Sequence, residues 1–169
     1  MRVLMLSWEY PPHVVGGLGQ HVASLLPAQA GLNLEVHLIT PRLTESPYRE
    51  SIGSVTIHRV DPPPASQSDV FTAAWQTNFR LTEAASRLWT ELGGLDVIHA
   101  HDWLAAFAAW TLKHAYRVPL VATIHATERG RGRGELHGEI ARAINDVEWR
   151  LTYEAWRVIC CSQYMASEV

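Results

Sequence analysis

Two neighbouring glycines near the start of the chain, Gly16 and Gly17, are the first residues whose type and spacing could support chemistry. They follow a short apolar run typical of a strand and precede an apolar-periodic segment typical of a helix. Glycine lets a ligand approach the backbone closely, and the first N–H groups of a helix attract anions. The pattern predicts a phosphate-binding turn, with a plain tight turn as the alternative.

Histidines and a carboxylate close two later apolar runs. His99, His101 and Asp102 belong to the segment DVIHAHD, and His125 ends the segment LVATIH. Residues two apart on a strand point to the same side, so a metal site formed with Asp102 and His125 is one interpretation. Strand geometry does not obviously bring these ligands together, and we expect no metal.

His99 is expected to be a structural histidine that points inward with its strand. His101 and Asp102 lie at a strand end, where we expect polar contacts to a sugar or phosphate. For His125 there are two interpretations, a hydrogen-bonded core histidine and a neutral imidazole that contacts a substrate. Its strand-end position favours the second interpretation. The other candidates flank these clusters and are Glu9, Thr127, Glu128, Trp8 and Trp103. The two tryptophans either belong to the core or stack on a sugar ring.

The elements that must position these residues alternate along the chain. Short apolar runs predict strands at 3–6, 34–40, 55–60, 96–101, 120–125 and 156–161, and helical periodicity lies between most of them. The stretch 42–54 and the proline-rich stretch 61–67 are predicted loops. This alternation predicts an α/β fold, a Rossmann-like doubly wound and mainly parallel sheet of about six strands. Its strand ends would bring the polar clusters into one crevice.

Sequence signals also mark where the helices begin and end. Asp69 and Ser162 are predicted helix N-caps, Gly93 a helix stop, and Pro27 the limit or kink of the first helix. The segment 127–138 is rich in glycine and arginine and is a predicted loop, with its three arginines on a mobile basic surface.

Composition narrows the class of protein. The chain has 169 residues, a size typical of one domain spanning 1–169, and a formal net charge of −3. No basic run dominates, so nucleic acid is not the expected partner. Cys160 and Cys161 are expected to be buried free thiols, as in the reducing cytoplasm. No segment approaches the roughly 20 apolar residues of a membrane span, and we expect a cytoplasmic protein.

Two common enzyme classes are disfavoured. The chain has no G-x-S-x-G motif, which disfavours a hydrolase with a serine nucleophile. The glycine run is not G-x-G-x-x-G, and Thr40, Pro41 and Arg42 stand where a ribose-binding acidic residue would follow the second strand. A nicotinamide enzyme is therefore not expected.

Four segments together resemble the glycogen synthases and family-four glycosyltransferases of the GT-B fold. They are SWEYPPHVVGGLGQHV, DVIHAHDWLAA, VATIHATERGR and VICCSQYM, and they occur in that order over nearly the whole chain. The resemblance implies retaining transfer of glucose from ADP- or UDP-glucose to the non-reducing end of an α-glucan, with no cofactor and no metal. The acceptor is an α-glucan or a small sugar.

The resemblance also implies roles for individual residues. Gly16 and Gly17 match the glycines that meet the donor phosphates, and His125 matches the histidine that contacts the donor sugar. His101 and Asp102 match a pair that borders the sugar site. With these we expect catalysis to involve His125, His101 and Asp102, the donor to meet Thr127 and Glu128, and the acceptor side to include Glu9 and Trp103.

Three departures from the family pattern are visible. Val14 stands where classical glycogen synthases have a lysine, and Leu104 stands where they have a histidine. Both differences favour family four over the classical synthases. GT-B enzymes also have a second Rossmann-like domain that holds most of the nucleotide site, and this chain spans only the first. The alternatives are a non-catalytic glucan-binding module and a different sugar-phosphate or nucleotide enzyme that uses the same crevice.

Overall fold

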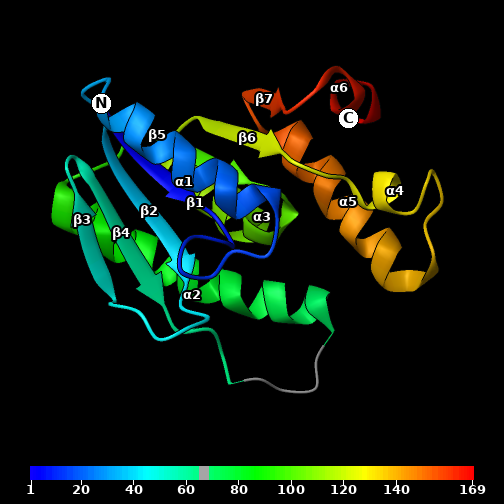
Figure 1. Ribbon diagram of the computed structural model, residues 1–169, viewed down its shortest axis with the longest axis horizontal. Helices are drawn as coiled ribbons and strands as arrows, with labels where there is room; N and C mark the ends of the chain where they lie inside the picture. The colour runs from blue at the N-terminus through cyan, green and yellow to red at the C-terminus, as the bar shows by residue number, and fades with distance from the viewer. Residues whose placement is uncertain (65–68) are drawn as a thin grey trace.

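The computed structural model describes residues 1–64 and 69–169, and a seven-stranded sheet in the order β3-β4-β2-β1-β5-β6-β7 is its centre (Figure 1). All neighbouring strands are parallel except β3 and β4, which are antiparallel. The strands are β1 (Arg2–Leu6), β2 (Glu35–Pro41), β3 (Arg49–Ile52), β4 (Val55–Val60), β5 (Val97–His101), β6 (Leu120–Ile124) and β7 (Arg157–Cys160). The predicted α/β class and mainly parallel sheet are confirmed.

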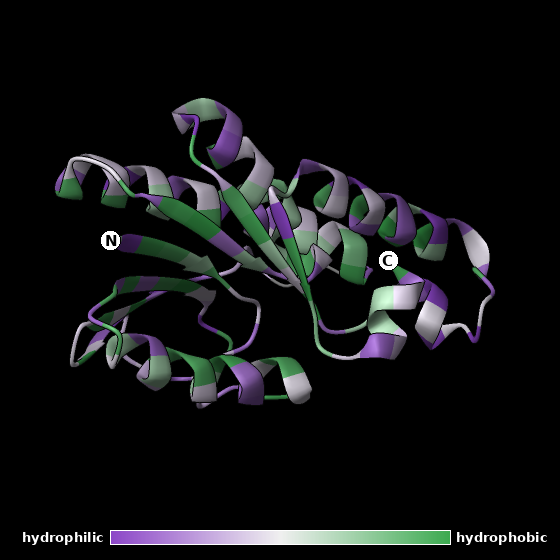
Figure 2. Cartoon of the chain, turned by 90° about the horizontal axis from the view of Figure 1, so that it is seen from above, coloured by the Kyte–Doolittle hydropathy of each residue, from purple (hydrophilic) through white to green (hydrophobic). Residues whose placement is uncertain are grey.

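Helices connect the strands and cover both faces of the sheet (Figure 1). They are α1 (Gly17–Ala30), α2 (Val70–Leu92), the short 3-10 helix η1 (Trp103–Ala105), α3 (Ala106–Tyr116), α4 (Glu128–Arg131), α5 (Gly138–Glu154) and α6 (Gln163–Glu168). One apolar cluster joins α1 to one face of the sheet. A larger cluster joins α2, α3 and α5 to the other face. The strands between them are largely hydrophobic (Figure 2).

The extra strand corrects the sequence prediction for residues 42–54. Arg49–Ile52 forms β3, which pairs with β4 across a turn where Gly53 has a φ of 59°. Only glycine adopts that left-handed conformation without strain. Strand β3 is a short edge strand whose residues are mostly exposed, so it carries no hydrophobic alternation that sequence analysis could detect.

Three of the four predicted helix signals, Asp69, Gly93 and Ser162, are confirmed. The side chain of Asp69 accepts a hydrogen bond from the backbone N–H of Thr72 at 3.0 Å, and Ser162 does the same for Met165 at 3.1 Å. Gly93 closes α2 in the left-handed conformation. Pro27 lies inside α1, which continues to Ala30 before it ends.

The predicted loop 127–138 contains one helical turn, α4, capped by the Thr127 side chain. Of the proline-rich stretch predicted as a linker, residues 65–67 lie outside the described part of the chain. None of the helices formed by the described residues has both the length and the apolar character needed to cross a membrane.

The two cysteines are free, as predicted, but they are not buried. Cys160 is half-buried and Cys161 is exposed. The prediction of buried thiols rested on the apolar run that they end, whereas β7 lies at the edge of the sheet and Cys161 follows its last residue. An edge strand has only one neighbour to cover it.

A candidate substrate cleft at the strand ends

An open cleft of about 460 Å³ lies where β1, β5 and β6 end. Its walls come from the turn before α1, from α1 itself, and from the segments that follow β5, β6 and β7. It is lined by Glu9, Gly16, Gly17, Leu18, His21, Asp102, Leu104, His125, Ala126, Arg131 and Cys161. The cleft therefore has the position at which open parallel sheets bind ligands, and it unites residues that are far apart in the sequence.

The glycine pair faces open space. A Cβ atom built on Gly16 or Gly17 would meet no atom within 4 Å. Gly16 has a φ of −147°, an extended conformation that any residue adopts. By contrast, a Cβ on Gly19 would lie 3.0 Å from the Glu9 side chain. Gly19 is therefore tightly packed within the turn, whereas Gly16 and Gly17 leave room on the cleft side for an approaching ligand.

Glu9 shapes the turn that precedes α1. Its Oε2 atom accepts hydrogen bonds from the backbone N–H groups of Val15 at 2.9 Å and Gly16 at 3.1 Å. Two N–H groups of the turn are thus already occupied by a carboxylate from this chain. The groups that α1 leaves for an external anion begin at Gly17, since the first N–H groups of a helix have no partner within it.

Asp102 joins the ends of two strands. Its Oδ1 atom accepts a hydrogen bond from the backbone N–H of His125 at 2.7 Å, and its own N–H donates to the Thr123 carbonyl at 3.0 Å. Its φ of 59° is unusual for a residue other than glycine, and such strain is concentrated at functional sites. Burial raises the pKa of the Asp102 carboxyl to about 6. The side chain holds His125 in place at the rim of the cleft.

His101 and His125 lie side by side across β5 and β6. The Nδ1 atom of His101 and the Nε2 atom of His125 share a hydrogen bond of 3.0 Å. The other ring nitrogen of His125, Nδ1, lies 3.5 Å from the Cys161 Sγ atom. The Nε2 atom of His101 is buried and has no hydrogen-bond partner in the described part of the chain.

Burial controls the charge of this pair. It is the main cause that lowers the pKa of His125 to about 4, and the neighbouring His21 lowers it further. Burial also holds the pKa of His101 well below its usual value. Both imidazoles are therefore neutral near pH 7, the form that can donate to or accept from a sugar hydroxyl. His99 is buried behind them and bonds the Thr123 Oγ1 atom at 2.7 Å, as expected of a structural histidine.

His21 is a residue of this cleft that sequence analysis did not single out. Its ring lies in edge contact with His125, with ring centres 4.9 Å apart, and 5.8 Å from the ring of His101. A signal was present, because His21 lies four residues after Gly17 and so shares a helix face with it. Arg131 and Cys161 also line the cleft. The position of Arg131 is fixed in part by Glu128, whose Oε2 atom lies 3.3 Å from its Nη1 atom.

Four of the predicted site residues do not line the cleft: His101, which is buried beside His125, and Trp103, Thr127 and Glu128. Trp103 is 3% exposed and stacks on Phe71 in the larger apolar cluster, which corresponds to the core interpretation of this tryptophan. Thr127 is buried and caps α4. The backbone N–H of Glu128 donates to both carboxylate oxygens of Glu148 at 2.9 Å. Trp8 is half-buried and packs against the same large cluster.

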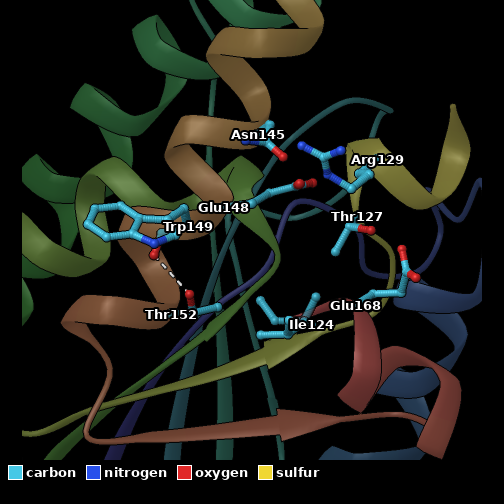
Figure 3. A pocket seen from close by; sticks show the side chains of 9 residues that line it. Ile124, Thr127, Arg129, Asn145, Glu148, Trp149, Thr152 and Glu168 are labelled. Carbon is cyan, nitrogen blue, oxygen red and sulfur yellow. Dashed lines mark hydrogen bonds between the residues drawn. The ribbon is translucent and has the colours of Figure 1, made fainter. Parts of the chain in front are cut away.

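Thr127 instead lines an adjoining pocket of about 240 Å³ between α4, α5 and α6 (Figure 3). Asn145, Glu148 and Arg129 point toward one another there. Burial raises the pKa of Glu148 to about 7. Through Glu128 and Arg131, Glu148 supports the turn that forms one wall of the cleft.

Within the described residues, one group of three side chains has the spacing of metal ligands. It consists of His21, His101 and His125, each of which offers one ligand atom within 4.8 Å of the others. The combination considered from sequence, with His99 and Asp102, does not converge, because the Asp102 carboxylate is engaged with the His125 backbone and His99 with Thr123.

Comparison with known proteins gives consistent matches. A family model described as Glycosyltransferase Family 4 matches residues 15–169. A glycogen synthase of Mycobacterium tuberculosis is 38% identical over 186 residues, which cover 100% of this chain and 44% of that protein. An uncharacterized glycosyltransferase of Methanocaldococcus jannaschii is 37% identical over 170 residues, which cover 100% of this chain and 42% of that protein.

Among solved structures, a sucrose-phosphate synthase of Thermosynechococcus elongatus superposes with a TM-score of 0.74 at 19% identity. The superposition covers 93% of this chain and 41% of that structure, and at this identity it shows the fold alone. The chain spans less than half the length of the curated relatives it matches.

Proposed function

The chain belongs to glycosyltransferase family 4, and on that premise we propose that it is the N-terminal, acceptor-side domain of a retaining GT-B enzyme. The complete enzyme transfers glucose from ADP- or UDP-glucose to an α-glucan or a small sugar acceptor. The similarity to a glycogen synthase along the whole chain supports a glucan product. Both cysteines are free, which fits a reducing cytoplasm.

The residues that line the cleft give this proposal its main support. An unobstructed glycine turn at the start of a helix faces a neutral histidine and a strand-end aspartate across one opening. The helix N-terminus and the exposed N–H of Gly17 suit a diphosphate. The histidine at the rim suits a sugar hydroxyl, so the two ends of a nucleotide sugar have complementary partners.

Each residue has a distinct part in this proposal. His125 contacts the donor glucose, and Asp102 positions His125 through its backbone N–H. His101 supports the ring of His125 through their shared hydrogen bond. Glu9 holds the glycine turn in shape and borders the acceptor side. No step of this transfer calls for a metal or a cofactor.

The cleft is open on one side, and we propose that a second Rossmann-like domain completes it. Closure of such a domain excludes water and brings the remaining donor-binding groups into place. The 169-residue chain alone is therefore expected to bind substrates weakly and to show no measurable glucosyl transfer.

The test is an assay of the complete protein with ADP-glucose and UDP-glucose, using glycogen and short maltooligosaccharides as acceptors. The expected result is transfer from one of the two donors, with retention of the anomeric configuration. Glycogen binding without transfer from either donor would favour the glucan-binding module instead. Robust transfer by the 169-residue chain alone would contradict the proposed need for a second domain.

A further inference from the structure

Three imidazoles meet at the inner end of the cleft, on the side of the sheet that α1 covers. His101 comes from the end of β5, His125 follows β6, and His21 projects from α1. One ligand nitrogen from each ring lies within 4.8 Å of the others. We propose that His21, His101 and His125 form a binding site for a divalent transition-metal ion of the zinc type, and that the bound ion blocks the cleft.

Two of the three ligand nitrogens already have nearly the separation that such an ion needs. The His101 Nδ1 and His125 Nε2 atoms are 3.0 Å apart. Nitrogens bound to one tetrahedral zinc ion lie about 2.0–2.1 Å from the metal and hence roughly 3.4 Å from each other. The ion replaces the shared hydrogen bond, so the two nitrogens separate by a few tenths of an ångström and both rings turn until their lone pairs face the ion.

The third ligand is free to adjust. His21 is not buried and lies on the surface of α1, so its side chain can rotate toward the pair without repacking the core. The other two are held firmly, because His101 is 0% exposed and Asp102 fixes the backbone of His125. A rigid pair with one mobile ligand lets an ion enter from the cleft and then be enclosed.

The surroundings suit a metal-bound histidine. Ligating histidines commonly use their other ring nitrogen to bond a neighbouring group, which fixes their orientation. For His125 that neighbour is Cys161, whose Sγ atom lies 3.5 Å from Nδ1 and therefore on the opposite side of the ring from Nε2. Cys161 thus orients the His125 ring and is not itself a ligand.

The ligand set also selects the class of ion. Three imidazole nitrogens without a carboxylate favour Zn²⁺, Co²⁺, Ni²⁺ and Cu²⁺ and do not suit Mg²⁺ or Ca²⁺. His21 and His125 line the cleft, so the fourth position of the ion faces open space, as in zinc sites that keep an exchangeable water. Binding withdraws His125 from the sugar. This inhibitory consequence rests on the proposed function, whereas ion binding does not.

The direct test is a calorimetric titration of the chelator-treated complete protein with ZnCl₂, repeated with MgCl₂. We expect one Zn²⁺ per chain and no Mg²⁺ binding. Co²⁺ serves as a spectroscopic probe, because imidazole-bound tetrahedral Co²⁺ absorbs strongly in the visible range. His21→Ala is expected to weaken Zn²⁺ binding at least tenfold and to abolish the Co²⁺ bands while leaving the melting temperature of the metal-free protein unchanged.

Two matched variants separate this site from its rivals. Cys161→Ser should retain Zn²⁺ binding, because the thiol is not a ligand. His58→Ala removes one ring from a second histidine pair, His37–His58, which belongs to no group of three potential ligands among the described residues, and should also retain binding. Unchanged Zn²⁺ affinity in His21→Ala, or loss of binding in Cys161→Ser alone, would overturn the proposed ligand set.

Measurements of glucosyl transfer then test whether the bound ion blocks the cleft. Zn²⁺ should inhibit transfer by the parent protein, and His21→Ala should need at least tenfold more Zn²⁺ for the same inhibition. Zn²⁺ binding without inhibition would show that the ion does not block the cleft, but would still support the metal site itself. Absence of transfer in any condition would count against the proposed function and not against the site, because calorimetry and the Co²⁺ spectrum do not depend on activity.

Discussion

Two pairs of histidines bridge neighbouring parallel strands in this protein. Each pair shares a ring-to-ring hydrogen bond and contains a ring with a lowered pKa, but the two pairs lie at different places in the sheet. His101 and His125 meet at 3.0 Å across β5 and β6, and His37 and His58 meet at 3.2 Å across β2 and β4. In both pairs one ring has its pKa lowered to about 4, with burial as the largest cause, as His125 and His58 show.

The pairs differ first in their position along the strands. His37 is the third residue of β2, well before the strand ends, and its Nε2 atom bonds the Glu35 carboxylate at 3.1 Å. His101 is the last residue of β5, and His125 follows the last residue of β6. The first pair is therefore satisfied within the sheet, whereas the second lies next to the cleft and borders a third imidazole.

They differ also in the face of the sheet that they occupy. His37 alternates with Val36 and Leu38, which pack toward α1, so it points to the opposite face. His99 and His101 alternate with Ile98 and Ala100, which pack in the larger cluster, so they point toward α1. The comparison teaches that strand position and face, and not residue type, separate the structural pair from the pair at the candidate site (the site pair).

The largest effect that we expect is on catalysis. His125→Ala in the complete protein should lower the transfer rate by about 10²–10³, the usual cost of one positioned hydrogen bond in a closed site. The melting temperature should fall no further than in His37→Ala, because the His125 ring is half-buried, although the buried His101 loses its partner. The measurement is kcat and melting temperature on the same variant.

His58→Ala is the matched control for that variant and should leave kcat per folded molecule unchanged. A large drop in the melting temperature of His125→Ala, combined with normal turnover of the folded fraction, would show that both pairs are structural.

The second effect is on stability and concerns the other pair. His37→Ala should cost roughly 1–3 kcal/mol of unfolding free energy, because it removes a buried ring and leaves His58 without its partner. Denaturant unfolding measures this loss. The transfer rate per folded molecule should stay at the parent value. A rate loss comparable to that of His125→Ala would contradict the assignment of a purely structural role to the His37–His58 pair.

The third effect concerns the cleft beside the site pair. Gly17→Val should weaken binding of the nucleotide-sugar donor about tenfold, or ~1.4 kcal/mol, because a side chain there enters the path of the diphosphate. The fold has room for it, since a Cβ on Gly17 meets nothing within 4 Å. Donor affinity and melting temperature are measured together.

Gly19→Ala is the counterpart, because its Cβ would lie 3.0 Å from the Glu9 side chain and should lower stability. Equal loss of stability in Gly17→Val, with unchanged donor affinity, would support the plain tight turn.

The last effect that we expect is the dependence of stability on pH. His125 and His58 have a pKa of about 4 in the folded protein and an ordinary value of 6.5. Between these values the unfolded chain binds more protons, so stability is fully present above pH 6.5 and is lost as the pH falls toward 4. His58→Gln and His125→Gln should each flatten that decline, as urea unfolding at pH 7, 6 and 5 would measure.

The raised pKa of Glu148, about 7, acts in the opposite direction, because its neutral form is favoured in the folded protein. The prediction therefore concerns the difference between each variant and the parent. A decline that neither variant alters would mean that burial does not keep these rings neutral.

Much of the architecture follows from the sequence by itself. Short apolar runs, helical periodicity and cap residues such as Asp69, Gly93 and Ser162 are local signals, and the structure has the elements that they predict. The position of His125, Asp102 and the glycine pair at strand ends was predicted for the same reason. Parallel strands end at one edge of a sheet, so residues that follow them gather in one crevice.

Only the tertiary structure decided which side chains face that crevice. Trp103 turns into the core, Thr127 lines a neighbouring pocket, and His21 enters from a helix whose packing no local pattern specifies. Cys161 is exposed because β7 lies at the sheet edge. Strand order, helix placement and side-chain direction depend on contacts between residues far apart in the chain. These contacts form only when the chain buries its apolar surface, so local sequence patterns do not predict them.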